Sequence, residues 1–131
     1  MSSFEYINPP TVPAAASRYS QGVVAPGPAR WLHVSGQVGI PVGGTLPDTF
    51  EEQARNAWRN VLGVLEGARM GPADLVKVTA YITRQADVGQ YRSVRDSMLG
   101  EAKPASTLVV VAGLADSRWL IEIEAVAAAA K

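Results

Sequence analysis

The fold is decided by residues 48–83, DTFEEQARNAWRNVLGVLEGARMGPADLVKVTAYIT, where a helical spacing of apolar residues gives way to a strand-like alternation. In the first part, apolar side chains recur every three or four residues, as in an amphipathic helix. These positions are Phe50, Ala54, Ala57, Val61, Leu65 and Ala68. Asp48 and Thr49 precede two glutamates with the spacing of a capping box, and Met70-Gly71-Pro72 ends the pattern. We predict a helix whose apolar stripe lies against a sheet.

The second part of this stretch, residues 75–83, alternates between apolar and polar side chains and predicts a strand. One face carries Val76, Val78, Ala80 and Ile82, and the other carries Lys77, Thr79, Tyr81 and Thr83. A second helix is predicted to follow, capped by Asp87 and stopped by Gly100. One side of it carries Val88, Tyr91, Val94 or Arg95, and Met98.

Two further strands are predicted in the C-terminal part. Residues 107–112 are almost continuously apolar and β-branched, which is typical of a strand buried on both faces. Residues 119–127 alternate, with Glu122 and Glu124 on one face. The other face of that strand carries Ile121, Ile123 and Ala125.

The N-terminal part predicts extended structure. Prolines 9, 10 and 13 exclude a helix, and a short strand is predicted at residues 4–7. Residues 21–25 and 31–37 are interpreted as a β-hairpin that turns at Pro26-Gly27-Pro28. In the second of these strands, Ser35 shares a face with Trp31 and His33, while Gly36 indicates a bulge or a close backbone approach.

These elements predict an α/β fold that occupies residues 1–131 as one domain. Two β-α-β crossovers imply right-handed connections, with both helices on one face of a mixed sheet of six strands. The other face has no covering layer in this chain. We therefore expect a second copy of the same sheet to cover it, in closed cyclic symmetry.

The composition excludes several classes of protein. The 131 residues carry twelve basic and twelve acidic side chains with no basic run, so we expect no nucleic-acid partner. The chain has no cysteine and one histidine, His33, which excludes thiolate chemistry and leaves too few ligands for a histidine-based metal site. No apolar run reaches the length of a membrane span, and residues 1–13 lack the pattern of a signal peptide. We expect a cytoplasmic protein with no membrane partner.

Several polar residues leave two interpretations open. Glu122 and Glu124 form either a solvated face or a pocket in which one of them acts as an acid, a base or a water-positioning group. Tyr19 either packs at a sheet edge or offers its hydroxyl to a ligand. Ser106 has no neighbouring base that would make it a nucleophile, so it either begins a strand or forms hydrogen bonds in a pocket. His33, among apolar neighbours, is interpreted as structural.

Five segments in order resemble one family. They are RYSQ at residues 18–21, WLHVSGQ at 31–37, EQARN at 52–56, DLVKVT at 74–79, and KPA at 103–105 followed by IEIEA at 121–125. They resemble the PYSQ, VSGQ, EEQTRQ and DVVKVT segments and the C-terminal block of the RidA/YjgF (L-PSP) family. The resemblance covers nearly the whole chain.

The resemblance implies a chorismate-mutase-like fold and a homotrimer whose sheets form a central barrel-like core. It implies clefts between subunits that bind a small molecule. Characterised relatives hydrolyse reactive enamines or imines to 2-keto acids and ammonia, without a cofactor or a metal. Their cleft holds the substrate carboxylate with an arginine just after the PA pair, and a glutamate in EIEA positions or activates the water.

Carried over by position, Glu122 matches the family glutamate, and Tyr19 and Gly36 match cleft residues beside Ser35. Ser106 stands where relatives have the arginine, and Arg92 stands where they often have asparagine. Replacing a bidentate guanidinium by one hydroxyl loses a charged hydrogen bond of about 1.5–3 kcal/mol, or about one to two powers of ten in binding.

Arg92, Arg95 or Arg118 are the candidates to restore a positive charge to the cleft. Three functions stay open. The first is imine hydrolysis with altered substrate preference, and the second is a non-catalytic binding or regulatory trimer. The third is another hydrolytic or lyase step on a ligand without a carboxylate. One histidine and zero net charge argue against a ribonuclease role, which has been attached to some relatives.

Overall fold

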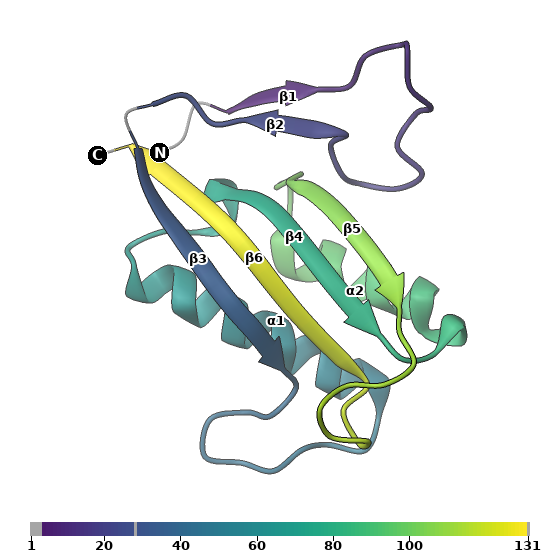
Figure 1. Ribbon diagram of the computed structural model, residues 1–131. Helices are drawn as coiled ribbons and strands as arrows, with labels where there is room; N and C mark the ends of the chain where they lie inside the picture. Colours follow the sequence, from purple (N-terminus) through teal and green to yellow (C-terminus); the bar gives the residue numbers. More distant parts are fainter. Residues whose placement is uncertain (1–3, 28, 131) are drawn as a thin grey trace.

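The computed structural model describes residues 4–27 and 29–130. Two helices lie on one face of a four-stranded sheet, and a two-stranded ribbon lies apart from it (Figure 1). In chain order the strands and α-helices are β1 Glu5–Ile7, β2 Gly22–Val24, β3 Ala29–Val38, α1 Phe50–Gly67, β4 Leu75–Ile82, α2 Val88–Leu99, β5 Ala105–Val110 and β6 Ile121–Ala130. Short 3-10 turns, Pro72–Asp74 and Gln85–Asp87, precede β4 and α2.

Helix α1 confirms the prediction from residues 48–83. Thr49 is its N-cap, and its hydroxyl accepts a hydrogen bond from the Glu52 backbone N–H at 3.3 Å. The predicted apolar stripe is buried except at Ala68, together with Trp58 and Gln53. Gln53 is buried because its side-chain amide bridges two loops, donating to the carbonyls of residues 47 and 118 and accepting from the backbone N–H of residue 120.

Helix α2 also begins and ends where the sequence predicts. Asp87 occupies the N-cap position, but its side chain does not cap the helix, because its carboxylate accepts from Arg84 Nε at 2.8 Å. Gly100 ends the helix with a φ of 60°, a conformation that favours glycine.

The sheet has the order β3-β6-β4-β5. Strand β6 pairs antiparallel with both β3 and β4, and β4 pairs in parallel with β5. The crossover through α2 therefore joins directly paired strands, while the crossover through α1 joins β3 to β4 with β6 between them. The core lies between the sheet and the helices and contains Val78, Ala80, Ile82, Ile121 and Ile123.

Two details of the strand predictions are wrong. The six strands are present, but β2 pairs with β1 rather than with β3, so they form a four-stranded sheet and a separate ribbon. Pro26 lacks an N–H group and disfavours the tight turn of a two-residue hairpin, and Pro28 lies outside the described residues. Among the described residues, one isolated bridge pairs Ser20, just before β2, with Ala105 of the sheet.

The second error concerns β5, which is an edge strand and not buried on both faces. Val109 and Val110 are 38% and 43% exposed. Only the side chains that share a face with Val78 and Ala80 pack toward the helices, and the others lie on the uncovered face. A run of β-branched residues therefore indicated a strand correctly, but not its place in the sheet.

The uncovered face of the sheet carries the polar side chains that the alternation predicted, together with the apolar residues Trp31, Val109 and Val126. Its side chains come from all four strands: Trp31, His33 and Ser35; Glu122, Glu124 and Val126; Lys77, Thr79 and Tyr81; Thr107 and Val109. His33 is exposed on this face of the single chain, and its interpretation as a structural histidine stays a prediction. No element of the described chain covers this face (Figure 1).

Neither helix in residues 4–27 and 29–130 is long and apolar enough to cross a membrane. The same described residues hold no group of three or more histidine, aspartate or glutamate side chains arranged to bind a metal ion.

Candidate functional site

Gly36 and Glu122 lie against each other on the uncovered face. The pairing of β3 with β6 shifts register between Val34 and Gln37, which confirms the predicted irregularity at Gly36. A Cβ atom at Gly36 would overlap the Glu122 carboxylate and lie 2.8 Å from its Cδ atom. The missing side chain at position 36 therefore creates the space in which the Glu122 carboxylate rests.

Glu122 has polar neighbours on the strand next to it. Tyr81 of β4 is its cross-strand partner, and Glu124 follows on the same face. Partial burial raises the pKa of Tyr81, and the charge of Glu124, a hydrogen bond with that carboxylate and the charge of Glu122 raise it further. Tyr81 therefore keeps its proton near neutral pH and remains a hydrogen-bond donor beside two carboxylates.

A shallow hollow of about 220 Å³ continues along the same face. His33, Lys77, Thr79 and Glu124 contribute its polar lining. The Lys77 ammonium donates to the Thr107 hydroxyl at 2.6 Å. The uncovered face thus carries charged groups of both signs, with Glu122 and Glu124 on β6 and Lys77 farther along β4.

A second group of candidate residues lines a cavity of about 170 Å³ on the helix side of the sheet. Tyr19 comes from the N-terminal segment, Arg92 from α2 and Ser106 from β5. Ser106 pairs with Val78 of β4 and so faces the helix layer rather than the uncovered face. The remaining lining residues are Ser17, Arg95 and Leu108.

The N-terminal segment is tied to the start of β5, which places Tyr19 beside this cavity. The Ser20 hydroxyl donates to the Lys103 carbonyl at 2.6 Å, and its backbone N–H donates to the Pro104 carbonyl at 3.2 Å. The Tyr19 hydroxyl accepts from the Ala16 backbone N–H at 3.4 Å. Tyr19 is half-buried and Ser20 is buried, so the segment is packed rather than free.

The three candidate arginines have different surroundings. Arg95 is 5% exposed, pairs with Asp96 at 3.0 Å and lies 6.0 Å from the Tyr91 ring centre. Arg118 pairs with Asp116 through two guanidinium nitrogens, and this contact lowers the pKa of Asp116 to about 2. Arg92 is half-buried, and the described residues provide its side chain with no hydrogen bond or ion pair.

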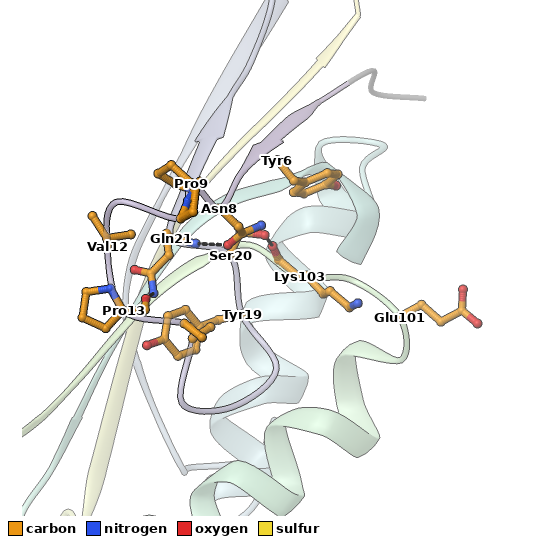
Figure 2. Close-up of a pocket in the computed structure, with 13 residues that line it drawn as sticks. Tyr6, Asn8, Pro9, Val12, Pro13, Tyr19, Ser20, Gln21, Glu101 and Lys103 are labelled. Carbon is orange, nitrogen blue, oxygen red and sulfur yellow. Dashed lines mark hydrogen bonds between the residues drawn. The ribbon is translucent and has the colours of Figure 1, made fainter.

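A larger cavity of about 780 Å³ lies between the ribbon, the N-terminal segment and the loop before β5 (Figure 2). Most of its lining is apolar or aromatic: Tyr6, Pro9, Pro10, Val12, Pro13, Ala14, Ala15 and Tyr19. The polar residues Asn8 and Gln21 contact each other, and Gln21 also donates to the Pro13 carbonyl at 2.8 Å. Sequence reasoning missed this cavity, because prolines 9, 10 and 13 indicate only that the segment is not a helix.

The sequence-predicted site residues therefore fall into two groups within one chain. Tyr19, Arg92 and Ser106 share the small cavity on the helix side. Glu122 and Gly36 touch each other on the opposite face, where Ser35 is also exposed. The two groups lie on opposite faces of the sheet, so one chain does not bring them together.

Comparison with known proteins identifies relatives over the whole of this fold. The family described as endoribonuclease L-PSP matches residues 10–129. A RutC family protein of Pyrococcus horikoshii is 32% identical over 125 residues, covering 94% of this chain and 96% of the relative. A 2-iminobutanoate/2-iminopropanoate deaminase of Rattus norvegicus is 33% identical over 117 residues, covering 88% of this chain and 82% of the relative.

A solved structure agrees with these matches. The Rid-family protein YyfB of Yersinia pestis, whose function is unknown, superposes with a TM-score of 0.84 at 29% identity. The alignment covers 95% of this chain and 97% of the other. The four-stranded sheet with two helices on one face is therefore the fold of Rid proteins.

Proposed function

Because the chain belongs to the endoribonuclease L-PSP family, which is the RidA/YjgF family that its motifs resemble, we propose that it hydrolyses reactive imines or enamines to a carbonyl product and ammonia. The observation that carries this proposal is the space that Gly36 leaves for the Glu122 carboxylate. A half-exposed carboxylate that rests in the space beside Gly36 suits the positioning and deprotonation of a water molecule.

The chemistry needs only a positioned acid–base group. The water oxygen adds to the imine carbon while Glu122 takes one of the water protons. Returning that proton to nitrogen gives the neutral carbinolamine R₂C(OH)NH₂. Glu122 then takes the hydroxyl proton and passes it to nitrogen as the C=O bond forms and the C–N bond breaks, so that R₂C=NH and H₂O become R₂C=O and NH₃. Glu122 ends the cycle ionised, and the proposed reaction uses no metal or cofactor.

The site is complete only if a second copy of the chain contributes to it. Glu122 and Gly36 lie on the uncovered face, whereas Tyr19, Arg92 and Ser106 line a cavity on the other face. In the proposed homotrimer, the uncovered faces pack together as a barrel-like core, and each cleft joins the Glu122 side of one subunit to the Tyr19 side of the next. Exposed Trp31 and Val109 on the uncovered face support such packing.

Ser106 gives this chain a substrate preference different from that of relatives with an arginine at this position. One hydroxyl provides a single hydrogen bond where a guanidinium provides two with charge. The alternative is a non-catalytic trimer that binds a small molecule in the same clefts. Ser106 favours that alternative, while the Gly36–Glu122 arrangement favours catalysis.

The test is to generate imines with an amino-acid oxidase and measure release of the keto acid, using small neutral, acidic and aromatic amino acids. Glu122→Gln is the test variant, and Glu66→Gln, which changes an exposed carboxylate on α1, is the matched control. The proposal expects acceleration by the wild type and by Glu66→Gln but none by Glu122→Gln. If the wild type binds ligand and accelerates no imine, the non-catalytic alternative replaces the proposal.

A further inference from the structure

The structure distinguishes the three arginines that could compensate for Ser106. Arg118 is 74% exposed, is paired with Asp116 and does not line the cavity. Arg95 lines the cavity, but Asp96 neutralises its charge and its Nη2 atom also contacts the Ser17 hydroxyl at 3.5 Å. Only Arg92 lines the cavity and keeps its guanidinium free of any partner among the described residues.

We infer that Arg92 is the anion anchor of this chain, so that the substrate carboxylate binds to α2 instead of to an arginine on β5. This inference rests on the proposed function and names the substrate class of the same site. Arg92 and the Ser106 hydroxyl line one small cavity, so both can donate to a single carboxylate. Because the Arg95–Asp96 pair contributes no net charge, the cavity keeps the positive charge of Arg92.

The lining of the larger cavity specifies the rest of the ligand. Tyr19 lines the small cavity with Arg92 and also the larger cavity, which Figure 2 shows. We therefore expect a ligand that extends past Tyr19 from Arg92 to enter the larger cavity. Its charged lining residues, Glu101 and Lys103, have opposite signs, and most of its other lining is proline, valine, alanine and tyrosine. The substrate class is therefore a 2-imino acid with an apolar side chain larger than an ethyl group.

The stable 2-oxo acids that correspond to these imines make the inference testable by calorimetry. Wild-type protein is titrated with 2-oxobutanoate, with its neutral amide and with 4-methyl-2-oxopentanoate. We expect the acid to bind at least about tenfold more tightly than the amide, because a charged hydrogen bond is lost in the amide. We expect the larger acid to gain about tenfold to twentyfold from two further buried carbons.

Four variants assign the two parts of the site. Arg92→Gln weakens binding of both acids about tenfold, whereas Arg59→Gln, an exposed arginine on α1, leaves it unchanged. The double variant Arg92→Gln with Ser106→Arg recovers acid binding, because it moves the cation to β5. Ala14→Trp places an indole ring in the larger cavity from an exposed position and reduces only the advantage of the larger acid.

Each contrary result overturns a stated part. Three results would refute the assignment of Arg92 as the carboxylate-binding residue. They are wild-type affinity in Arg92→Gln, no binding of either acid by the wild type, and equal binding of the acid and its amide. Equal affinity of the wild type for the two acids would refute the claim that the larger cavity binds the substrate side chain. The measurements use binding alone, so an anchored acid without turnover refutes only the proposed hydrolysis, and turnover that survives Arg92→Gln refutes only the anchor.

Discussion

Replacing Gly36 with alanine should displace the Glu122 carboxylate while the fold keeps its stability. The new Cβ atom would overlap the carboxylate and lie 2.8 Å and 3.0 Å from the Cδ and Cγ atoms of Glu122. Gly36 is not among the glycines with positive φ, which are Gly43 and Gly100, so alanine fits its backbone conformation. The clash is therefore with the end of one flexible side chain, which must leave its place.

The size of each effect follows from this geometry. Moving one side chain to a less favourable rotamer costs about 0.5–1.5 kcal/mol, so the folded state survives. A displacement of about 1 Å in a catalytic group costs about a hundredfold in rate. Gly36→Ala is therefore expected to lose about two powers of ten in kcat for imine hydrolysis while unfolding close to the wild-type temperature.

Gly63→Ala is the matched control, because a Cβ atom there meets no atom within 4 Å. Alanine in the middle of α1 stabilises the helix by about 0.5–1 kcal/mol and leaves the rate unchanged. The keto-acid assay and thermal unfolding are measured on all three proteins. A Gly36→Ala protein with the wild-type rate, or one that loses activity only because it unfolds, refutes the reasoning.

Three further predictions concern the fold. Gly39→Ala places a Cβ atom 2.5 Å from the Gln53 backbone, which cannot move as a side chain does, and we expect a loss of at least about 3 kcal/mol in urea unfolding. Gln53→Leu leaves two carbonyls and one N–H group without their partner, and the same measurement should show a loss of about 2–4 kcal/mol, whereas an unchanged midpoint would contradict the bridging role. Arg118 lowers the pKa of Asp116 from 3.8 to about 2, so the contribution of this contact to the free energy of folding is present above pH 4 and is lost as the pH falls toward 2. Asp116→Asn should therefore make stability less dependent on pH between 4 and 2. An unchanged pH dependence in that window would contradict the contact.

The spacing of apolar residues and the positions of glycines predicted those parts of the fold that depend on neighbouring residues in the sequence. The apolar stripe from Phe50 to Leu65 and the alternation along β4 specify which face is buried. Both are confirmed except at Val76, which is only half-buried because a register shift at this point leaves Leu75 buried instead. The irregularity at Gly36 was also predicted, because a glycine near a strand end indicates a bulge or a close approach. These signals are local, so one sequence suffices to interpret them.

Strand partners were not predictable in the same way. Nothing local to β2 shows that it pairs with β1 instead of β3, and nothing in β5 shows that it is an edge strand. Pairing depends on the whole chain, since any two strands of suitable length can form a ladder. Burial of Gln53 was missed for the same reason, because its hydrogen-bond partners lie in two distant loops.

The candidate site was predictable only as a set of residue types. The resemblance selected Tyr19, Arg92 and Ser106, and the structure brings these three to one cavity. It also shows that Glu122 lies on the other face, which no spacing in the sequence reveals. The choice of Arg92 over Arg95 depends on the pairing of Arg95 with Asp96, which only the folded arrangement shows.

The most direct test of the account is complementation between two inactive variants. Glu122→Gln damages the uncovered-face half of the site, and Arg92→Glu reverses the charge of the cavity half. The two proteins are unfolded, mixed in equal amounts and refolded together, and imine hydrolysis is compared with that of each variant refolded alone. Random assembly of a cyclic trimer should restore about a quarter of the clefts to two intact halves, and therefore about a quarter of the wild-type rate. A mixture as inactive as its components, at equal recovery of folded protein, would contradict a site shared between two chains.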